Sequence, residues 1–392
     1  MRSWPIILLP LVALACPTFA GTYYVATDGS ANNDGSEASP WPSIEYALSR
    51  VGGGQTIIVR PGIYRGPIEI SKAHMGTEER PTIVKSEVKW KAVIIGAEYH
   101  GISNSDECDW VVVDGFEVMG ARYDGIKMNG DHNVVRNCWS HHNGSMGIGS
   151  HDQVGTVIEN NLIEFNGSHI QFHHGVYASG DRLTIRSNIV RHNAGYGLHL
   201  YSSIRNSLVA NNLVCGHAHK PGIIVACPAE GGNNVVVNNT VVSDNVAVSI
   251  WQPSNELLAN NILMAGTEVV SVQGDEAKVT ADYNLCVPES RWQGPHGITA
   301  DPMFVAQGRG VYWLQPGSPA IGKGAAEHAP PTDFWGQPRP KDRPPDLGAF
   351  AFVPWLATEQ ARADWYFGWA YRRTPGGDHE IPDLWALPPS VK

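Results

Sequence analysis

Four side chains in the middle of the sequence have the types that an acid–base reaction needs: Lys127, His174, Tyr177 and His199. Histidine titrates near neutral pH and is a natural general base. A tyrosine beside a cation can donate or accept a proton, and a lysine can neutralise a carboxylate. We therefore expect β-elimination of a uronic-acid glycan. Lys127 would face the substrate carboxylate, His199 or His174 would be the base, and Tyr177 would be its partner in proton transfer.

Other chemistries stay open. Asp152 and Asp181 follow strands in adjacent repeats and could flank a glycosidic bond, as a glycoside hydrolase requires. C5-epimerisation would share the proton chemistry of elimination. A protein without catalysis, binding glycan or acting as a surface module, is the remaining alternative.

No metal or other cofactor is predicted. The chain has 16 histidines but no HExxH spacing. Zinc or copper could be held by His174, His199 and a third imidazole, so a transition metal stays an alternative. Calcium needs clustered carboxylates, and only Asp124 stands near Lys127 in the sequence.

A repeated phrase between Asn133 and Leu263 indicates which elements position these residues. It reads NVVRNCW, TVIENNL, LTIRSNI, SLVANNL, VVVNNTV and LLANNIL. Its asparagine position, which recurs once per period, holds Cys138, Asn161, Asn188, Asn212, Asn239 and Asn261. A second phrase, HGI, DGI, MGI, HGV, YGL and PGI, runs beside it. Two short apolar strands per period, with no room for a helix, predict an all-β solenoid of parallel coils.

Strand alternation predicts which side chains leave the core. In DGIKMNG, Ile126 and Met128 must point inward, so Lys127 and Asn129 point outward. The same alternation in every coil predicts two neighbouring outward rows, whose members are about 4.8 Å apart. One row is Ser103, Lys127, Gly149, Tyr177, His199, Ile224, Ser249 and Ser271, and the other is Ser105, Asn129, His151, Ser179, Tyr201, Ala226, Trp251 and Gln273.

These rows predict a glycan groove over the middle coils. Gly149 should leave a gap between Lys127 and Tyr177 for a sugar ring, and Tyr201 and Trp251 offer flat surfaces for stacking. An inserted loop, Gly167–His173, should form a wall of the groove. The expected substrate-binding residues are Asn129, His151, His173, Tyr201 and Trp251.

The two ends of the chain differ from the repeats. Residues 1–20 have a basic Arg2, an apolar stretch and a small-residue cleavage site, which predict a secretory signal and a secreted or periplasmic protein. Ser43–Val51 reads as a short amphipathic helix that would cap the first coil. The solenoid is expected over residues 21–354, and residues 355–392 are expected to cap the far end.

Several segments also resemble a known superfamily. The opening TYYVATDGS, the IIVRPGIYRG at Ile57–Gly66 and the GTEERPTIV at Gly76–Val84 are similar to the first coils of secreted right-handed parallel β-helix proteins of the pectate-lyase-like superfamily. The closing DPMFV, LQPGSPAIGKG and PDLGAF are similar to how that group ends its helix. The resemblance implies a right-handed parallel β-helix. It leaves the reaction open among lyases, hydrolases, esterases, epimerases and binders.

Composition limits the partners. Without Arg2 the expected mature chain has a net charge of −11 (27 − 38), with no basic stripe, so a polysaccharide is expected and nucleic acid is not. No stretch is long enough to span a membrane. Five mature cysteines at irregular spacing predict no disulfide framework, although Cys215 and Cys227 could pair, and Cys138 should be a buried thiol. A monomer is expected.

Overall fold

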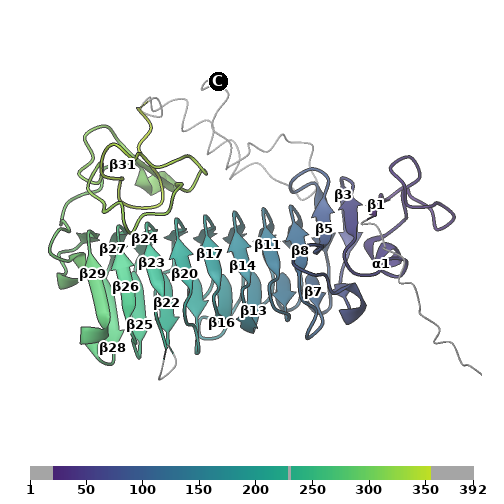
Figure 1. Ribbon diagram of the computed structural model, residues 1–392, viewed down its shortest axis with the longest axis horizontal. Helices are drawn as coiled ribbons and strands as arrows, with labels where there is room; N and C mark the ends of the chain where they lie inside the picture. Colours follow the sequence, from purple (N-terminus) through teal and green to yellow (C-terminus); the bar gives the residue numbers. More distant parts are fainter. Residues whose placement is uncertain (1–20, 228–230, 355–392) are drawn as a thin grey trace, which may run out of the picture.

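The computed structural model describes residues 21–227 and 231–354. They form a solenoid of parallel strands stacked coil upon coil, with α1 (Ile44–Leu48) beside β1 at one end (Figure 1). Each regular coil contributes one strand to each of three long sheets. The prediction of an all-β parallel β-helix is therefore confirmed. The expected signal (1–20) and C-terminal cap (355–392) lie outside the described residues.

The three sheets are named here in the order in which a coil visits them. Sheet 1 consists of β4 (Ile68–Ile70), β7 (Ile102–Asn104), β10 (Ile126–Met128), β13 (Ile148–Val154), β16 (Val176–Asp181), β19 (Leu198–Leu200), β22 (Ile223–Ala226), β25 (Val248–Trp251) and β28 (Val270–Gln273). Sheet 2 consists of β1 (Thr22–Val25), β2 (Thr56–Val59), β5 (Thr82–Ser86), β8 (Val111–Asp114), β11 (Val134–Arg136), β14 (Val157–Glu159), β17 (Thr184–Arg186), β20 (Leu208–Ala210), β23 (Val235–Val237), β26 (Glu256–Ala259) and β29 (Val279–Asp282). Sheet 3 consists of β3 (Gly62–Arg65), β6 (Ala92–Ile95), β9 (Glu117–Met119), β12 (Trp139–His141), β15 (Leu162–Glu164), β18 (Ile189–Arg191), β21 (Leu213–Cys215), β24 (Thr240–Ser243), β27 (Ile262–Ala265) and β30 (Leu285–Val287).

The prediction of two strands per period was wrong, because each coil has three. The asparagine phrase is itself two strands separated by a sharp turn. The first turn residue has a left-handed backbone, with φ between 52° and 58°, at Asn137, Asn160, Ser187, Asn211, Asn238 and Asn260. Asparagine tolerates this conformation better than most residues, so the chain can turn from sheet 2 to sheet 3 there.

A buried asparagine ladder supports that turn. Each side chain donates from Nδ2 to the Oδ1 of its neighbour at 3.0 or 3.1 Å, through Asn161, Asn188, Asn212, Asn239, Asn261 and Asn284. Cys138 lies at the start of the ladder, fully buried, and its backbone N–H donates to Asn161. A second ladder, at the corner between sheets 3 and 1, was not predicted: Asn143 donates to Asn166, and Asn166 to Asn193. Both ladders satisfy backbone groups that the corners would otherwise leave unpaired.

The core is a continuous column of aliphatic side chains inside the coils. Ile126, Met128, Ile148, Val176 and Leu198 from sheet 1 have no exposed surface. Stacking of coils, and not cross-linking, stabilises the fold, because Cys108, Cys138, Cys215, Cys227 and Cys286 are all buried and free. The possible Cys215–Cys227 pair does not form.

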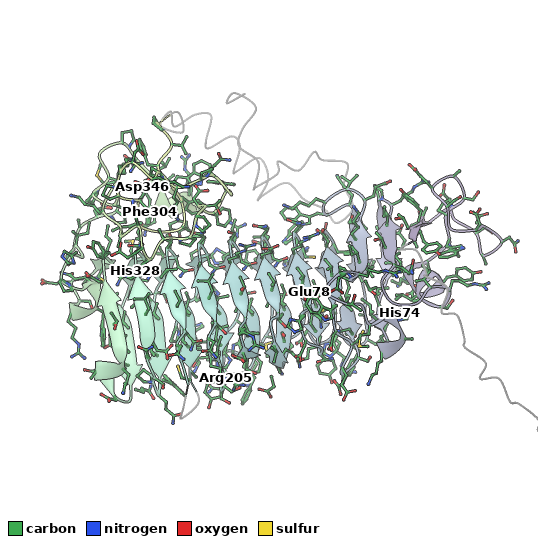
Figure 2. All side chains as sticks on the ribbon, in the orientation of Figure 1. His74, Glu78, Arg205, Phe304, His328 and Asp346 are labelled. Atoms are coloured by element: carbon green, nitrogen blue, oxygen red, sulfur yellow. The ribbon has the colours of Figure 1, made fainter. Side chains whose placement is uncertain are left out.

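The two ends of the described chain pack on different parts of the solenoid. The apolar side of α1, Ile44, Ala47 and Leu48, joins the core of the first coils. The chain after β30 folds back, forms the antiparallel pair β31 (Phe304–Ala306) and β32 (Val311–Leu314), and covers apolar side chains on the outer face of sheet 3. Figure 2 shows this lobe, with Phe304, His328 and Asp346 labelled, at the opposite end from His74.

Among the described residues, the loops contain four 3-10 turns: η1 (Lys72–His74), η2 (Glu276–Lys278), η3 (Arg291–Gln293) and η4 (Gln307–Arg309). In the described part of the chain, no helix is long and apolar enough to cross a bilayer.

Candidate functional site

The first outward row has the predicted register on sheet 1. Lys127 pairs with Gly149, Gly149 with Tyr177, and Tyr177 with His199. The row continues in both directions, to Ser103, Ile224, Ser249 and Ser271. Ile126 and Met128, on either side of Lys127, are fully buried. Lys127, Tyr177 and His199 therefore lie on one outer wall, although 72 positions (199 − 127) separate the first from the last.

A bulge displaces the second row. Ser150 pairs with Ala178, but the next pair is Gln153 with Gly180, so His151 and Asp152 together face Ser179. Asp152 takes up the extra residue with a left-handed backbone (φ 56°). The outward direction predicted for His151 agrees with the structure, because Ser150 is fully buried and His151 is partly exposed. The bulge shifts the register of the residues that follow Ser150.

His151 links the lysine to the tyrosine. Lys127 Nζ lies 3.1 Å from His151 Nδ1, and the His151 and Tyr177 rings meet edge to face with centroids 4.2 Å apart. The open gap expected over Gly149 is not present, because a Cβ at Gly149 would lie 2.9 Å from Asp124 Oδ2 and 3.1 Å from Lys127 Cδ. The lysine side chain and the Asp124 carboxylate fill that space.

Tyr177 continues the set to His199. Their rings are stacked with centroids 4.8 Å apart. His199 also stacks on Tyr196 at 4.4 Å and on Tyr201 at 5.3 Å, and Tyr201 meets Trp251 edge to face at 5.7 Å. Sequence reasoning missed Tyr196. Its signal was present in the YGL phrase, which places it one coil after His174 in the same corner.

His174 is in the cluster but is buried. Its side chain is 2% exposed, its ring lies 4.2 Å from that of His199, and its Nδ1 accepts the backbone N–H of Tyr196 at 3.3 Å. Burial, reinforced by His199, lowers the pKa of His174 to about 2. A neutral, covered imidazole cannot reach a substrate, so His174 supports the His199 ring and the alternative that made it the base is set aside.

The exposed members of the cluster are held in defined protonation states. Burial lowers the pKa of His199 to about 4 and that of His151 to about 4, so both rings are neutral near pH 7. Burial raises the pKa of Tyr177, which keeps its hydroxyl protonated. Burial also lowers the pKa of Lys127, against the attraction of Asp124. A neutral imidazole, a protonated phenol and an ammonium group with a lowered pKa are the forms that general acid–base chemistry uses.

Two imidazole nitrogens in the cluster make no hydrogen bond to the described residues. His199 Nδ1 and His151 Nε2 have no hydrogen-bond partner among the described residues, although both atoms are out of contact with solvent. Buried polar atoms in proteins are nearly always paired, so an unpaired one marks a position where a ligand or water belongs. We take Lys127, His151, Tyr177 and His199 as the candidate site.

Two predicted binding residues are occupied elsewhere. Asn129 donates its side-chain amide to the backbone carbonyl of Asn104 and so continues a turn. His173 Nδ1 accepts the backbone N–H groups of Ser168 and His169 at 3.1 Å, which closes the inserted loop on itself. The loop carries the exposed side chains Ile170 and Phe172.

The two aspartates of the hydrolase alternative do not face each other in register. Asp181 pairs with Val154, two residues beyond Asp152. Asp152 Oδ1 accepts the hydroxyls of Ser179 and Ser203, both at 3.0 Å. Asp181 is ion-paired with Arg182 at 3.1 Å and accepts Asn206 Nδ2 at 2.8 Å. Both carboxylates hold turns together.

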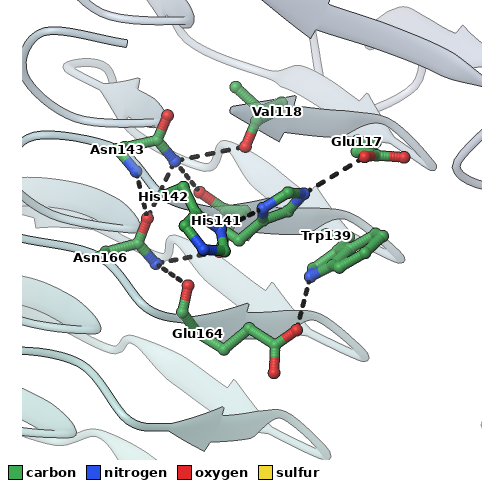
Figure 3. Close-up of polar contacts among 9 residues, drawn as sticks. Glu117, Val118, Trp139, His141, His142, Asn143, Glu164 and Asn166 are labelled. Carbon is green, nitrogen blue, oxygen red and sulfur yellow. Dashed lines mark hydrogen bonds and ion pairs between the residues drawn. The ribbon is translucent and has the colours of Figure 1, made fainter. Parts of the chain in front are cut away.

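A second cluster of titratable groups lies on sheet 3 (Figure 3). His141 Nε2 lies 3.3 Å from Glu117 Oε1, and His141 Nδ1 lies 2.8 Å from His142 Nδ1. Glu164 accepts Trp139 Nε1 at 3.0 Å. These groups satisfy one another and are mostly buried, unlike the unpaired nitrogens on sheet 1. We read this cluster as structural.

A cavity of about 370 Å³ lies between sheet 2 and the C-terminal lobe, over Leu208, Val235 and Val237 and beside His328. None of the candidate residues lines it. A polymer can lie along an open surface such as the outer face of sheet 1, whereas the C-terminal lobe closes this cavity on one side. Across residues 21–227 and 231–354, no three His, Cys, Asp or Glu side chains are grouped to hold a metal ion.

Known proteins resemble this chain over parts of the solenoid. A family model described as Pel9A-like, right handed beta helix region, matches residues 23–174, and a model of right handed beta helix regions matches residues 100–264. Pectate lyase L of Dickeya chrysanthemi is 28% identical over 139 residues, which are 32% of this chain and 32% of that enzyme. The protein of the same name from Paenibacillus polymyxa (strain SC2) is 30% identical over 142 residues, 33% of this chain and 30% of its own length. The match thus spans about a third of these relatives.

The fold agrees along a greater length. The crystal structure of pectate lyase Pel9A superposes with a TM-score of 0.64 at 18% identity, covering 85% of this chain and 96% of that one. This chain is similar to pectate-lyase-like right-handed β-helix proteins and has their fold. The resemblance predicted from its first and last coils is confirmed. The β-helix fold also occurs in a complex of XylC with xylose, with a TM-score of 0.55 at 11% identity. The fold of this protein therefore does not by itself define its reaction.

Proposed function

We propose that this protein is a polysaccharide lyase that cleaves a uronic-acid glycan by β-elimination on the outer face of sheet 1. The observation that carries the proposal is the unbroken contact from Lys127 through His151 and Tyr177 to His199, in which the imidazoles are neutral and two of their nitrogens are unpaired. Relatives named as pectate lyases support the same class of reaction.

Each residue of the site has a separate role in the proposed reaction. Lys127 faces the uronate carboxylate and stabilises the negative charge that develops when the neighbouring C–H bond breaks. The His199 imidazole takes the proton from C5, and the electron pair of that bond forms the C4–C5 double bond. The C4–O bond breaks, and Tyr177 gives its hydroxyl proton to the leaving oxygen. Exchange with solvent then returns both residues to their starting forms.

The low pKa of His199 fits this order of events. Without substrate the ring is neutral, so one of its nitrogens has a free lone pair. An anionic sugar bound beside it favours the protonated form, because an opposite charge nearby raises the pKa of an imidazole. The substrate thus strengthens its own base. His151, between Lys127 and Tyr177, holds the lysine over the sugar carboxylate.

The other reactions have weaker support. Hydrolysis needs two free carboxylates at the scissile bond, and both Asp152 and Asp181 are engaged in turns. A purely binding wall needs no perturbed acid–base groups, and the pKa values of His151, Tyr177 and His199 are all displaced from their usual values. Epimerisation at C5 uses the same base and differs in the fate of the sugar, so product analysis separates it.

The test is a screen of uronate-containing polysaccharides for the ultraviolet absorbance of an unsaturated product. Lys127→Met, Tyr177→Phe and His199→Gln should each lower the rate by about 10²- to 10⁴-fold, the usual effect of a general acid or base. Ser271→Ala is the matched control, because Ser271 lies in the same row three coils beyond His199.

Three results would overturn the proposal. Cleavage without new absorbance that is abolished by Asp152→Asn would show hydrolysis. Inversion at C5 without chain cleavage, seen by NMR of the treated polymer, would show epimerisation. Full activity in all three variants would show that the site is misplaced, whatever the reaction.

Export is part of the proposal. Polymeric uronates are too large to enter a cell intact, so their depolymerase belongs outside the cytoplasm. Fractionation of the natural host should find the protein in the medium or periplasm, and a cytoplasmic location would contradict this.

A further inference from the structure

Two exposed tyrosines form a platform at the corner between sheets 3 and 1, in the coil of Lys127 and the coil before it. Tyr99 is 57% exposed and Tyr123 is 42% exposed, and their rings meet at 61° with centroids 5.0 Å apart. The Tyr123 backbone N–H donates to the Tyr99 carbonyl at 3.0 Å, so the pair is fixed by the stacking of two coils. Exposed large aromatic side chains held rigidly together are unusual on a protein that binds nothing.

A cation lies against this platform. The Arg122 guanidinium carbon is 5.7 Å from the centroid of the Tyr123 ring. Arg122 is exposed and has no ion-pair partner among residues 21–227 and 231–354. An arginine can bind a carboxylate through two parallel N–H groups, and here its forked end is available for one.

The platform is continuous with the candidate site. The His100 ring lies 4.6 Å from that of Tyr99 and 6.1 Å from that of Tyr123. His100 Nδ1 is 3.6 Å from Asp124 Oδ2, and the Asp124 carboxylate is among the charges that act on Lys127. Tyr123 lies four positions before Lys127, at the corner that leads into β10.

We propose that Tyr99, Arg122 and Tyr123 form a uronate-binding subsite for a sugar that is not the one undergoing reaction. The sugar ring packs on the exposed tyrosine faces, and its carboxylate pairs with Arg122. His100 contacts both tyrosine rings and lies beside Asp124, which connects the platform to Lys127. The subsite therefore favours a chain that carries one carboxylate at Arg122 and another at Lys127. Its uronate specificity rests on the proposed function, but its ability to bind glycan does not.

The experiment measures binding of uronate oligosaccharides of increasing length by calorimetry, in a Tyr177→Phe background that prevents turnover. Arg122→Gln and Tyr123→Ala should each weaken binding of long oligomers roughly tenfold, the size of one charge-assisted or stacking contact. Binding of the shortest oligomers, which fill only the reacting position, should not change. For carboxyl-reduced oligomers, Tyr123→Ala should still weaken binding and Arg122→Gln should not.

The matched control is Arg60→Gln. Arg60 also lies over a tyrosine ring, 5.8 Å from the centroid of Tyr24, but on sheet 2. It should bind all oligomers as the parent does. Equal affinities of parent, Arg122→Gln and Tyr123→Ala for every length would refute the subsite while leaving the lyase proposal intact. If these variants lose affinity in a length-dependent way, and the protein with Tyr177 intact produces no unsaturated uronide, the subsite is supported and the lyase proposal is refuted.

Discussion

Replacing Gly149 by alanine tests the candidate site without removing any of its functional groups. Gly149 lies between Lys127 and Tyr177 in the outward row. A Cβ there would lie 2.9 Å from Asp124 Oδ2, 3.1 Å from Lys127 Cδ and 3.5 Å from Lys127 Nζ. The backbone of Gly149 is not left-handed, so alanine adds one methyl group and no backbone strain.

The size of the effect follows from these contacts. Ordinary contact begins at 3.4 Å, so the methyl group would overlap both the Asp124 oxygen and the Lys127 stem. Both neighbours are ends of side chains and can move by a few tenths of an ångström. Such a shift away from His151 would take the 3.1 Å contact of Lys127 Nζ to the limit of a hydrogen bond. Small displacements in an active site cost up to about 100-fold, so we expect kcat/KM to fall roughly 10- to 100-fold.

Stability should change little. Alanine lowers the conformational entropy of the unfolded chain, which stabilises the fold by about 0.4–1 kcal/mol, and crowding of the buried methyl group against Asp124 and Lys127 offsets a similar amount. Urea unfolding should therefore place Gly149→Ala within about 1 kcal/mol of the parent. Gly308→Ala is the matched control, because a Cβ at Gly308 meets nothing within 4 Å. It should keep full activity.

Two results would refute this reasoning. Full activity of Gly149→Ala with parental stability would mean that the position of Lys127 does not matter to the reaction. A large loss of stability would mean that the methyl group strains the coil itself, and that the side chains of Asp124 and Lys127 do not move aside as the contacts indicate.

Three further predictions concern pH, the ladder and the thiols. On the acid side, kcat/KM should fall near pH 4, where His199 becomes protonated, and not near pH 6.5. On the alkaline side, kcat/KM should begin to fall at a pH below 10.5, as Lys127 loses its proton. A decrease near pH 6.5 would exclude His199 as the base. Asn188→Leu should lower the free energy of unfolding by roughly 4 kcal/mol, because its side chain makes buried contacts with Asn161, Asn212 and the Ile158 carbonyl; a loss below about 1 kcal/mol in urea titrations would contradict the ladder's role. In folded protein, a thiol reagent at pH 8 should leave the five described cysteines unmodified, since all are buried and burial raises the pKa of each; fast reaction before unfolding would contradict this.

The row of side chains could be predicted because it depends on only two regularities. Alternation along a strand predicted that Lys127 points away from the core. The repeated HGI-type phrase predicted which residue of the next coil lies beside it. Neither step needs a side-chain conformation. The same regularities predicted that Tyr177 and His199 are neighbours, and their stacked rings follow from the spacing of parallel strands.

The three-strand coil could not be predicted from hydrophobic periodicity. Strands of three residues are shorter than the window in which alternation can be recognised, and Asn137 with Cys138 looked like the middle of one longer strand. Only the left-handed backbone at Asn137 separates them. The second asparagine ladder was missed although its signal was present, because Asn143, Asn166 and Asn193 each lie five residues after Cys138, Asn161 and Asn188 of the first ladder.

Side-chain packing also could not be predicted from the sequence. Gly149 was expected to leave an opening, but a long flexible neighbour fills any space that a missing side chain leaves beside it, and Lys127 does so. His174 was expected at the surface because it begins an HGV corner. The rings of Tyr196 and His199 cover it instead, and a residue's exposure depends on such neighbours, which the sequence does not place.

Contacts between the two outward rows explain why the chemistry is concentrated on these coils. The His151 ring, from the second row, lies against Lys127 and Tyr177 of the first row and is largely desolvated there. Desolvation keeps the imidazole neutral, so that it can accept a hydrogen bond from the lysine. Tyr201 makes the corresponding contact with His199 one strand further on. Packing of one row against the other thus displaces the pKa values of residues that would titrate normally if each were surrounded by water.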